Sequence, residues 1–70
     1  MINHYAIRRA KTIIDMYKEL SPEYATEDKN VVVGDMLADL QYLLCDRFQY
    51  NWKDVESVQI VAYNAIKGQE

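Results

Sequence analysis

The sequence has 70 residues, with two glycines, one proline, one cysteine and a formal net charge of −3. Half of the residues are hydrophobic, which disfavours intrinsic disorder, and the scarcity of glycine and proline disfavours a turn-rich all-β fold. A chain this short holds a single domain with a modest core, whose stability dimerisation would raise. We therefore predict one all-α domain over residues 1–70, built from three helices with short connections.

Charge is distributed unevenly along the chain. Basic residues outnumber acidic ones in residues 1–20, whereas residues 21–47 are acidic, which disfavours nucleic acid as a partner. The single cysteine cannot form an internal disulfide, and the sequence shows neither a secretory leader nor an apolar run of membrane-spanning length. We therefore expect a cytoplasmic protein that does not associate with membranes.

The first helix is expected over residues 3–20, because apolar residues recur at helical spacing along this segment. Asn3 can cap its first turn. Pro22 ends the helix, since the residue before a proline is pushed away from helical dihedrals. Ser21 can also cap a short extra turn that has Pro22 at its first position.

The second helix is expected over residues 28–48, where large apolar side chains project on one broad arc. We call these residues the leucine arc: Val33, Met36, Leu37, Leu40, Leu43, Leu44 and Phe48. Leu37, Leu40 and Leu44 are expected at the centre of the core. Residues 31–33 can also be interpreted as a strand, but the run is too short and has no partner.

The third helix is expected over residues 53–67, with Asn51 as its cap. Its apolar residues are Val55, Val58, Val61, Ala62, Ala65 and Ile66. Residues 58–63 are rich in β-branched side chains and could form a strand, yet the alternation fails and no second strand is available. FQYNW, residues 48–52, is interpreted as the hinge between the last two helices, because a base-stacking platform would need interleaved basic residues.

The run GDMLADLQYLLCDRF, residues 34–48, resembles the D-L-L-A-D-L-x-x-x-x-C-D core of small uncharacterised proteins that are common in phages, prophages and plasmids. In that family the core tends to be followed by a Gly-Leu-Asp-Phe-like turn, where this chain has Gln49 in place of the glycine. The resemblance covers at most residues 34–70. It implies a helical fold and an origin in a mobile genetic element, and it implies no activity.

No constellation of catalytic residues is visible in the sequence. His4 is the only histidine and is expected to be a solvated residue of a first helical turn. Cys45 lacks a second cysteine or a nearby histidine for a zinc site, and a small buried side chain is its simpler interpretation. We expect no enzymatic activity, no metal and no cofactor.

Four aspartates of the second helix are separated by 7, 4 and 7 residues, which confines them to an arc of about 40°. We call them the acidic ridge: Asp28, Asp35, Asp39 and Asp46. The ridge lies opposite the leucine arc, so it can simply be the solvated back of a core helix. Its functional interpretation is a surface that binds an arginine-rich partner or mimics phosphate spacing.

A stripe of small residues on the same helix is the second candidate surface. It consists of Gly34, Ala38 and Cys45, with Gln41 and Tyr42 beside it. Small side chains let another backbone come close, and that backbone can belong to a helix of the same chain or to a symmetry mate. Ile60 projects outside the apolar side of the third helix and could join such an interface.

These features predict a non-enzymatic protein-interaction module of mobile-element origin, an inhibitor or modulator of a host protein that acts through its acidic helix. One alternative is a small dimeric nucleic-acid-binding regulator that uses the basic first helix, where Arg8, Lys11 and Lys18 share a face. A purely structural subunit is the other alternative. A homodimer is compatible with each of them.

Overall fold

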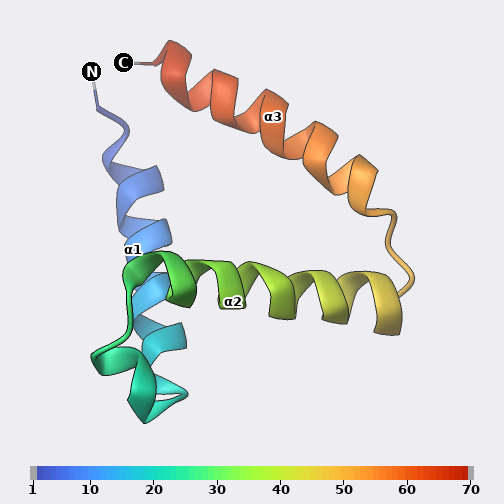
Figure 1. The fold of residues 1–70 in the computed structure, drawn as a ribbon. Helices are drawn as coiled ribbons and strands as arrows, with labels where there is room; N and C mark the ends of the chain where they lie inside the picture. Colours follow the sequence, from blue (N-terminus) through green and yellow to red (C-terminus); the bar gives the residue numbers. More distant parts are fainter. Residues whose placement is uncertain (1, 70) are drawn as a thin grey trace.

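A computed structural model describes residues 2–69, and within this range the chain folds into three α-helices without a strand (Figure 1). The helices are α1 (His4–Glu19), α2 (Lys29–Gln41) and α3 (Trp52–Gly68). A short 3-10 helix, η1 (Pro22–Ala25), follows α1, and a π-helical segment, η2 (Tyr42–Arg47), continues α2. The predicted all-α domain of three helices is confirmed, and both strand alternatives are wrong because residues 31–33 and 58–63 are helical.

Short polar side chains begin the three helices. The side-chain oxygens of Asn3, Asp28 and Asn51 each accept a hydrogen bond from a backbone N–H two or three residues later, at 3.0, 2.8 and 2.9 Å respectively. Each bond satisfies an N–H group that has no partner inside its helix. The predicted caps Asn3 and Asn51 are confirmed, and Asp28, expected in the acidic ridge, is also the cap of α2.

The extra turn predicted after α1 is present as η1, with Pro22 at its first position. Ser21 precedes it in extended conformation, but the Ser21 hydroxyl donates to a Glu23 carboxylate oxygen at 3.2 Å and caps no backbone N–H. The extra turn is therefore confirmed, while its capping by the serine side chain is wrong.

The second helix does not continue as a regular α-helix to Phe48, as the sequence predicted. From Tyr42 onward it widens into η2, whose hydrogen bonds span five residues, as in the 3.1 Å bond from Phe48 N to Leu43 O. The segment is closed by a 2.7 Å bond from Tyr50 N to Leu44 O. Gln49 lies between these donors with φ of 61°, the left-handed region that favours glycine. The hinge predicted at residues 48–52 is confirmed.

The three helices form an open, flat triangle (Figure 1). The two ends of the described chain meet, since Asn3 Nδ2 donates a 2.7 Å hydrogen bond to Gln69 Oε1, and α3 spans the distance back from the hinge. The radius of gyration is 14.0 Å and the principal extents are 36 × 31 × 16 Å. A compact chain of this length would have a radius of gyration of about 11 Å. The helices are therefore ordered individually but do not surround a common centre.

The core is much smaller than the sequence predicted. Among the described residues only Val32 is buried, at 3% exposure, where the start of α2 crosses α1 near Ile14. Leu37 and Leu40, expected at the centre, are 49% and 42% exposed. That expectation is wrong for Leu37 and Leu40 because α3 spans the open side of the triangle and does not cover them (Figure 1), while Leu44 is half-buried.

None of the helices within residues 2–69 combines the length and the apolar character required to cross a membrane.

Candidate interaction surface

Two tyrosines and two aspartates tie α1, η1 and α2 together. Tyr17 Oη donates to Asp39 Oδ2 at 2.5 Å, and Tyr24 Oη donates to Asp35 Oδ2 at 3.0 Å. The two hydroxyl oxygens are 3.3 Å apart, and the two rings stack with their centroids separated by 5.3 Å. This polar network therefore links α1 and η1 to α2.

Both tyrosines keep their protons more tightly than an ordinary tyrosine. The hydrogen bond to Asp39 is the largest cause that raises the pKa of Tyr17, followed by the bond with Tyr24, because a phenolate would lose the first bond and repel the carboxylate. For Tyr24, the bond with Tyr17 lowers the pKa, but partial loss of solvent and the bond to Asp35 outweigh it and raise the pKa. Both hydroxyls therefore remain donors near neutral pH.

The acidic ridge occupies a different position from the one the sequence predicted. Asp35 and Asp39 lie on the side of α2 that meets α1 and η1, where they accept the tyrosine hydrogen bonds, so this part of the ridge is not simply the solvated back of the helix. All four aspartates are nevertheless exposed. Asp46 lies in η2 and makes no hydrogen bond or ion pair with residues 2–69, and the change to π-helix takes it off the line that an α-helical spacing of 100° per residue would give.

The structure leaves the stripe of small residues uncovered at Gly34. No atom lies within 4 Å of the place where a Cβ of Gly34 would be, so the interpretation that a helix of the same chain is seated there is wrong at this residue. Ala38, Gln41 and Tyr42 are exposed, and Cys45 is half-buried in η2. Ile60 is exposed on α3.

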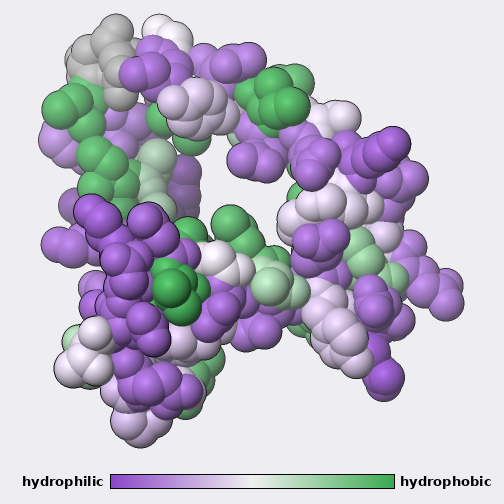
Figure 2. All heavy atoms as spheres, in the orientation of Figure 1, coloured by the Kyte–Doolittle hydropathy of each residue, from purple (hydrophilic) through white to green (hydrophobic). Residues whose placement is uncertain are grey.

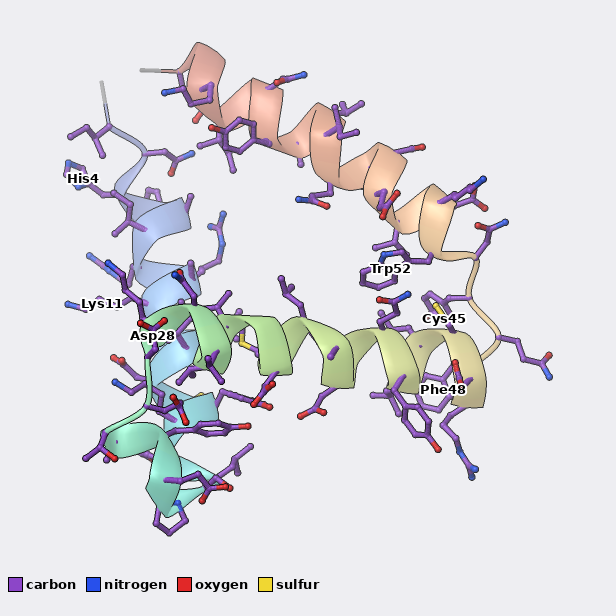
Figure 3. All side chains as sticks on the ribbon, viewed as in Figure 1. His4, Lys11, Asp28, Cys45, Phe48 and Trp52 are labelled. Atoms are coloured by element: carbon purple, nitrogen blue, oxygen red, sulfur yellow. The ribbon has the colours of Figure 1, made fainter. Side chains whose placement is uncertain are left out.

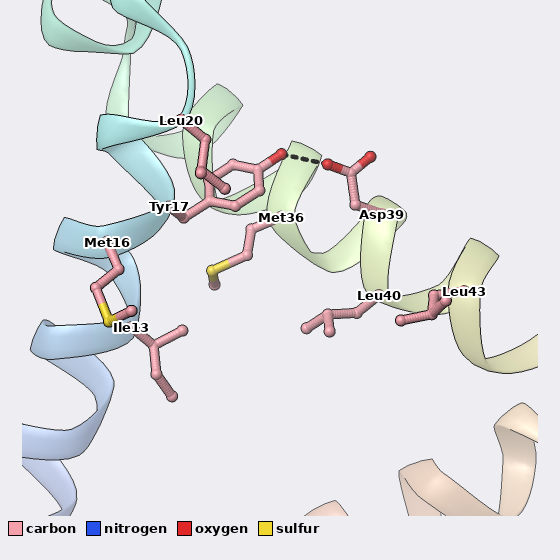
Figure 4. Close-up of a pocket in the computed structure, with 8 residues that line it drawn as sticks. All are labelled: Ile13, Met16, Tyr17, Leu20, Met36, Asp39, Leu40 and Leu43. Carbon is pink, nitrogen blue, oxygen red and sulfur yellow. Dashed lines mark hydrogen bonds between the residues drawn. The ribbon is translucent and has the colours of Figure 1, made fainter.

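An apolar groove lies in the angle between α1 and α2, with a volume of about 380 Å³ (Figure 4). The bonded pair Tyr17 and Asp39 belongs to its lining. Its apolar wall is formed by Ile13, Met16, Leu20, Met36, Leu40 and Leu43. The groove was not predicted from the sequence. The sequence does show apolar residues at helical spacing on each of the two helices. The angle between the helices is what brings these residues into one surface, and the sequence does not reveal that angle.

Large apolar side chains remain accessible on all three helices. Drawn with all heavy atoms, the molecule still has an opening between α2 and α3, and hydrophobic side chains gather on visible parts of α1, α2 and α3 (Figure 2). Exposure on this scale is unusual for a monomeric protein.

The residues with catalytic potential lie apart. Figure 3 shows His4 at the start of α1 and Cys45 on the opposite side of the molecule, near the end of the second helix. Within residues 2–69, no group of three or more histidine, cysteine or acidic side chains is arranged to hold a metal ion. The basic residues Arg8 and Lys11 of α1 are exposed, and neither forms an ion pair inside the described range.

No protein-family model matches the chain, and neither a curated protein nor a solved structure matches it.

Proposed function

We propose that the protein is a non-enzymatic protein-interaction module that associates with itself and binds a further protein through the carboxylates of its second helix. The observation that carries this proposal is the exposure of large apolar side chains on every helix while Val32 alone is buried in the described chain. A chain with so small a core gains most from burying its surface against another protein.

The acidic ridge supplies a surface for a basic partner. Tyr17 and Tyr24 bond to the Oδ2 atoms of Asp39 and Asp35, and no hydrogen bond within residues 2–69 engages the Oδ1 atoms. An arginine side chain of the partner can donate to these oxygens, since a guanidinium matches the geometry of a carboxylate.

The resemblance of residues 34–70 to mobile-element proteins supports a phage or prophage origin and action in the host cytoplasm. In that setting the partner would be a host protein with an arginine-rich segment, and the module would inhibit or modulate it. The exposed Arg8 and Lys11 of α1 support the alternative of a nucleic-acid-binding regulator, but the carboxylates of α2 oppose it.

Capture from host lysate at low and at physiological salt tests the acidic ridge. The test variant replaces Asp35, Asp39 and Asp46 by asparagine, which keeps an oxygen that can accept the tyrosine hydrogen bonds. We expect a partner that binds the wild type to be lost from this variant, and binding by the wild type to weaken as salt rises.

The matched control removes the same number of charges elsewhere, through Glu19→Gln, Glu23→Gln and Glu56→Gln. It should capture the partner as the wild type does. Equal capture by the wild type and the ridge variant at both salt concentrations would contradict the proposed role of the ridge.

A further inference from the structure

One side of α3 carries an apolar stripe that no residue in the range 2–69 covers. The stripe consists of Val58, Val61, Ala62 and Ala65, at the spacing of one helical face, and these residues line a shallow surface depression. Val58 and Val61 are each 70% exposed. Their side chains are short, so another helix can approach the α3 backbone closely along this stripe.

The groove between α1 and α2 is a second uncovered apolar surface. Its lining comes from α1 and its C-cap Leu20, from α2 and from Leu43 of η2, and Met16 and Leu43 are exposed on its two sides. These long, flexible side chains differ in kind from the valines and alanines of the stripe, and such a combination lets the residues of one helix fit between those of two others.

The α3 helix is held away from the groove of its own chain. At one end the hinge at residues 48–51 is closed by the bond from Tyr50 N to Leu44 O, and at the other end Asn3 is bonded to Gln69. With both ends fixed, α3 spans the open side of the triangle (Figure 1). The stripe and the groove therefore stay apart within one chain.

The exposed area matches what a dimer would bury. The accessible surface of the chain is 6163 Å². A compact monomer of 8.2 kDa would expose about 4,500 Å². The excess of roughly 1,600 Å² is about twice the area of about 800 Å² that each partner buries in a protein–protein interface of standard size. Two contacts of standard size with a second copy would remove this excess, whereas one would remove about half of it.

We infer that the α3 stripe of one copy docks in the α1–α2 groove of a second copy, and that the second copy returns the same contact. This inference rests on the self-association proposed above and names its surfaces. Each copy contributes one helix and accepts one, so the contact is self-complementary and closes as a twofold dimer. The two contacts together cover the groove side chains and the face of α3 that a single chain leaves in water.

Sedimentation equilibrium of the full chain and two variants tests the inference. Val61→Asp places a charge in the stripe, and Tyr63→Asp places the same charge on a nearby exposed position of α3 outside it. We expect the wild type and Tyr63→Asp to be dimers at micromolar concentration, and Val61→Asp to need at least tenfold higher concentration to associate. Circular dichroism of the dilute samples checks that all three chains remain helical.

Disulfide trapping identifies the contact itself. In a Cys45→Ser background, chains with Ala62→Cys are mixed with chains with Leu43→Cys and oxidised gently. We expect a covalent dimer of the two different chains. Glu56→Cys, which lies off the stripe on the same helix, replaces Ala62→Cys in the control mixture and should give little of this product.

The outcomes separate the inference from the proposal beneath it. A dimer that survives Val61→Asp and gives no mixed disulfide would overturn the docking of α3 but leave self-association standing. A monomer at all accessible concentrations would overturn both. A third chain carries both Ala62→Cys and Leu43→Cys in the Cys45→Ser background. If it stays monomeric and forms the disulfide within itself, α3 closes on its own groove, and this too would overturn the inference.

Discussion

The corner between α1 and α2 and the span of α3 differ in how they are held, although all three helices carry apolar faces. At the corner, Val32 is buried and two tyrosine–aspartate hydrogen bonds join the elements. The α3 helix is attached at its ends, through the hinge and the Asn3–Gln69 bond, and its apolar stripe is exposed. An apolar face thus predicts that a helix packs against another element. A few specific contacts determine which element of the chain it packs against.

A substitution that disrupts the packing of α1 against α2 at Val32 should lower stability more than any other change. Val32→Asp would bury an unpaired carboxylate, which costs about 3 kcal/mol or more and should unfold a domain this small. Val31→Asp is the matched control, because Val31 is the adjacent valine in the same helical turn but is exposed. Thermal melts followed by circular dichroism should show cooperative unfolding for the control and none for Val32→Asp. Similar melts for both variants would mean that Val32 does not anchor the corner.

Leu40→Ala tests whether the groove between α1 and α2 is covered by a second copy. In an isolated chain the partly exposed Leu40 should contribute less than the 2 to 5 kcal/mol typical of a core leucine. In a dimer that covers the groove, the loss should approach about 2 kcal/mol and depend on protein concentration. Denaturant unfolding at low and high protein concentration measures both quantities. A loss that does not change with concentration would indicate that Leu40 is not part of an intermolecular contact.

The tyrosine network should give the corner a pH dependence that α3 lacks. Because the pKa of Tyr17 is raised in the folded state, its contribution is fully present below the unfolded pKa of about 10 and is lost as pH rises toward the folded pKa. Wild-type melting temperature should therefore fall more steeply above pH about 10 than that of Tyr17→Phe. Tyr63→Phe on α3, which removes no hydrogen bond within residues 2–69, should retain the wild-type profile. Parallel profiles for all three chains would contradict this role.

A substitution in the hinge between the corner and α3 should raise the free energy of unfolding, and this is the smallest of the expected effects. Gln49→Gly removes a left-handed side-chain clash worth roughly 1 to 2 kcal/mol but adds freedom to the unfolded chain, so a net gain of about 0.5 kcal/mol is expected. Gln41→Gly, at the last residue of α2, should instead cost about 1 kcal/mol. Urea unfolding compares the two. A loss of stability in both variants would show that Gln49 is not strained.

The sequence by itself determined the elements that depend on neighbouring residues. Asn3 and Asn51 cap helices because their side chains reach backbone N–H groups two or three residues away, and Pro22 starts η1 because its ring presets φ. The hinge after Phe48 was likewise visible in the sequence. Its left-handed residue was obscured because glutamine, not glycine, occupies position 49.

Only the tertiary structure decided which apolar faces meet. The leucine arc of α2 predicted a core around Leu40, yet α1 packs at Val32, on the edge of that arc, because the hydroxyl of Tyr17 bonds to Asp39 across the corner. The same contact turned part of the acidic ridge into a structural element and brought apolar residues of two helices into one groove. Hydrophobic attraction has no direction and cannot select among several apolar faces, whereas a hydrogen bond between residues distant in sequence can.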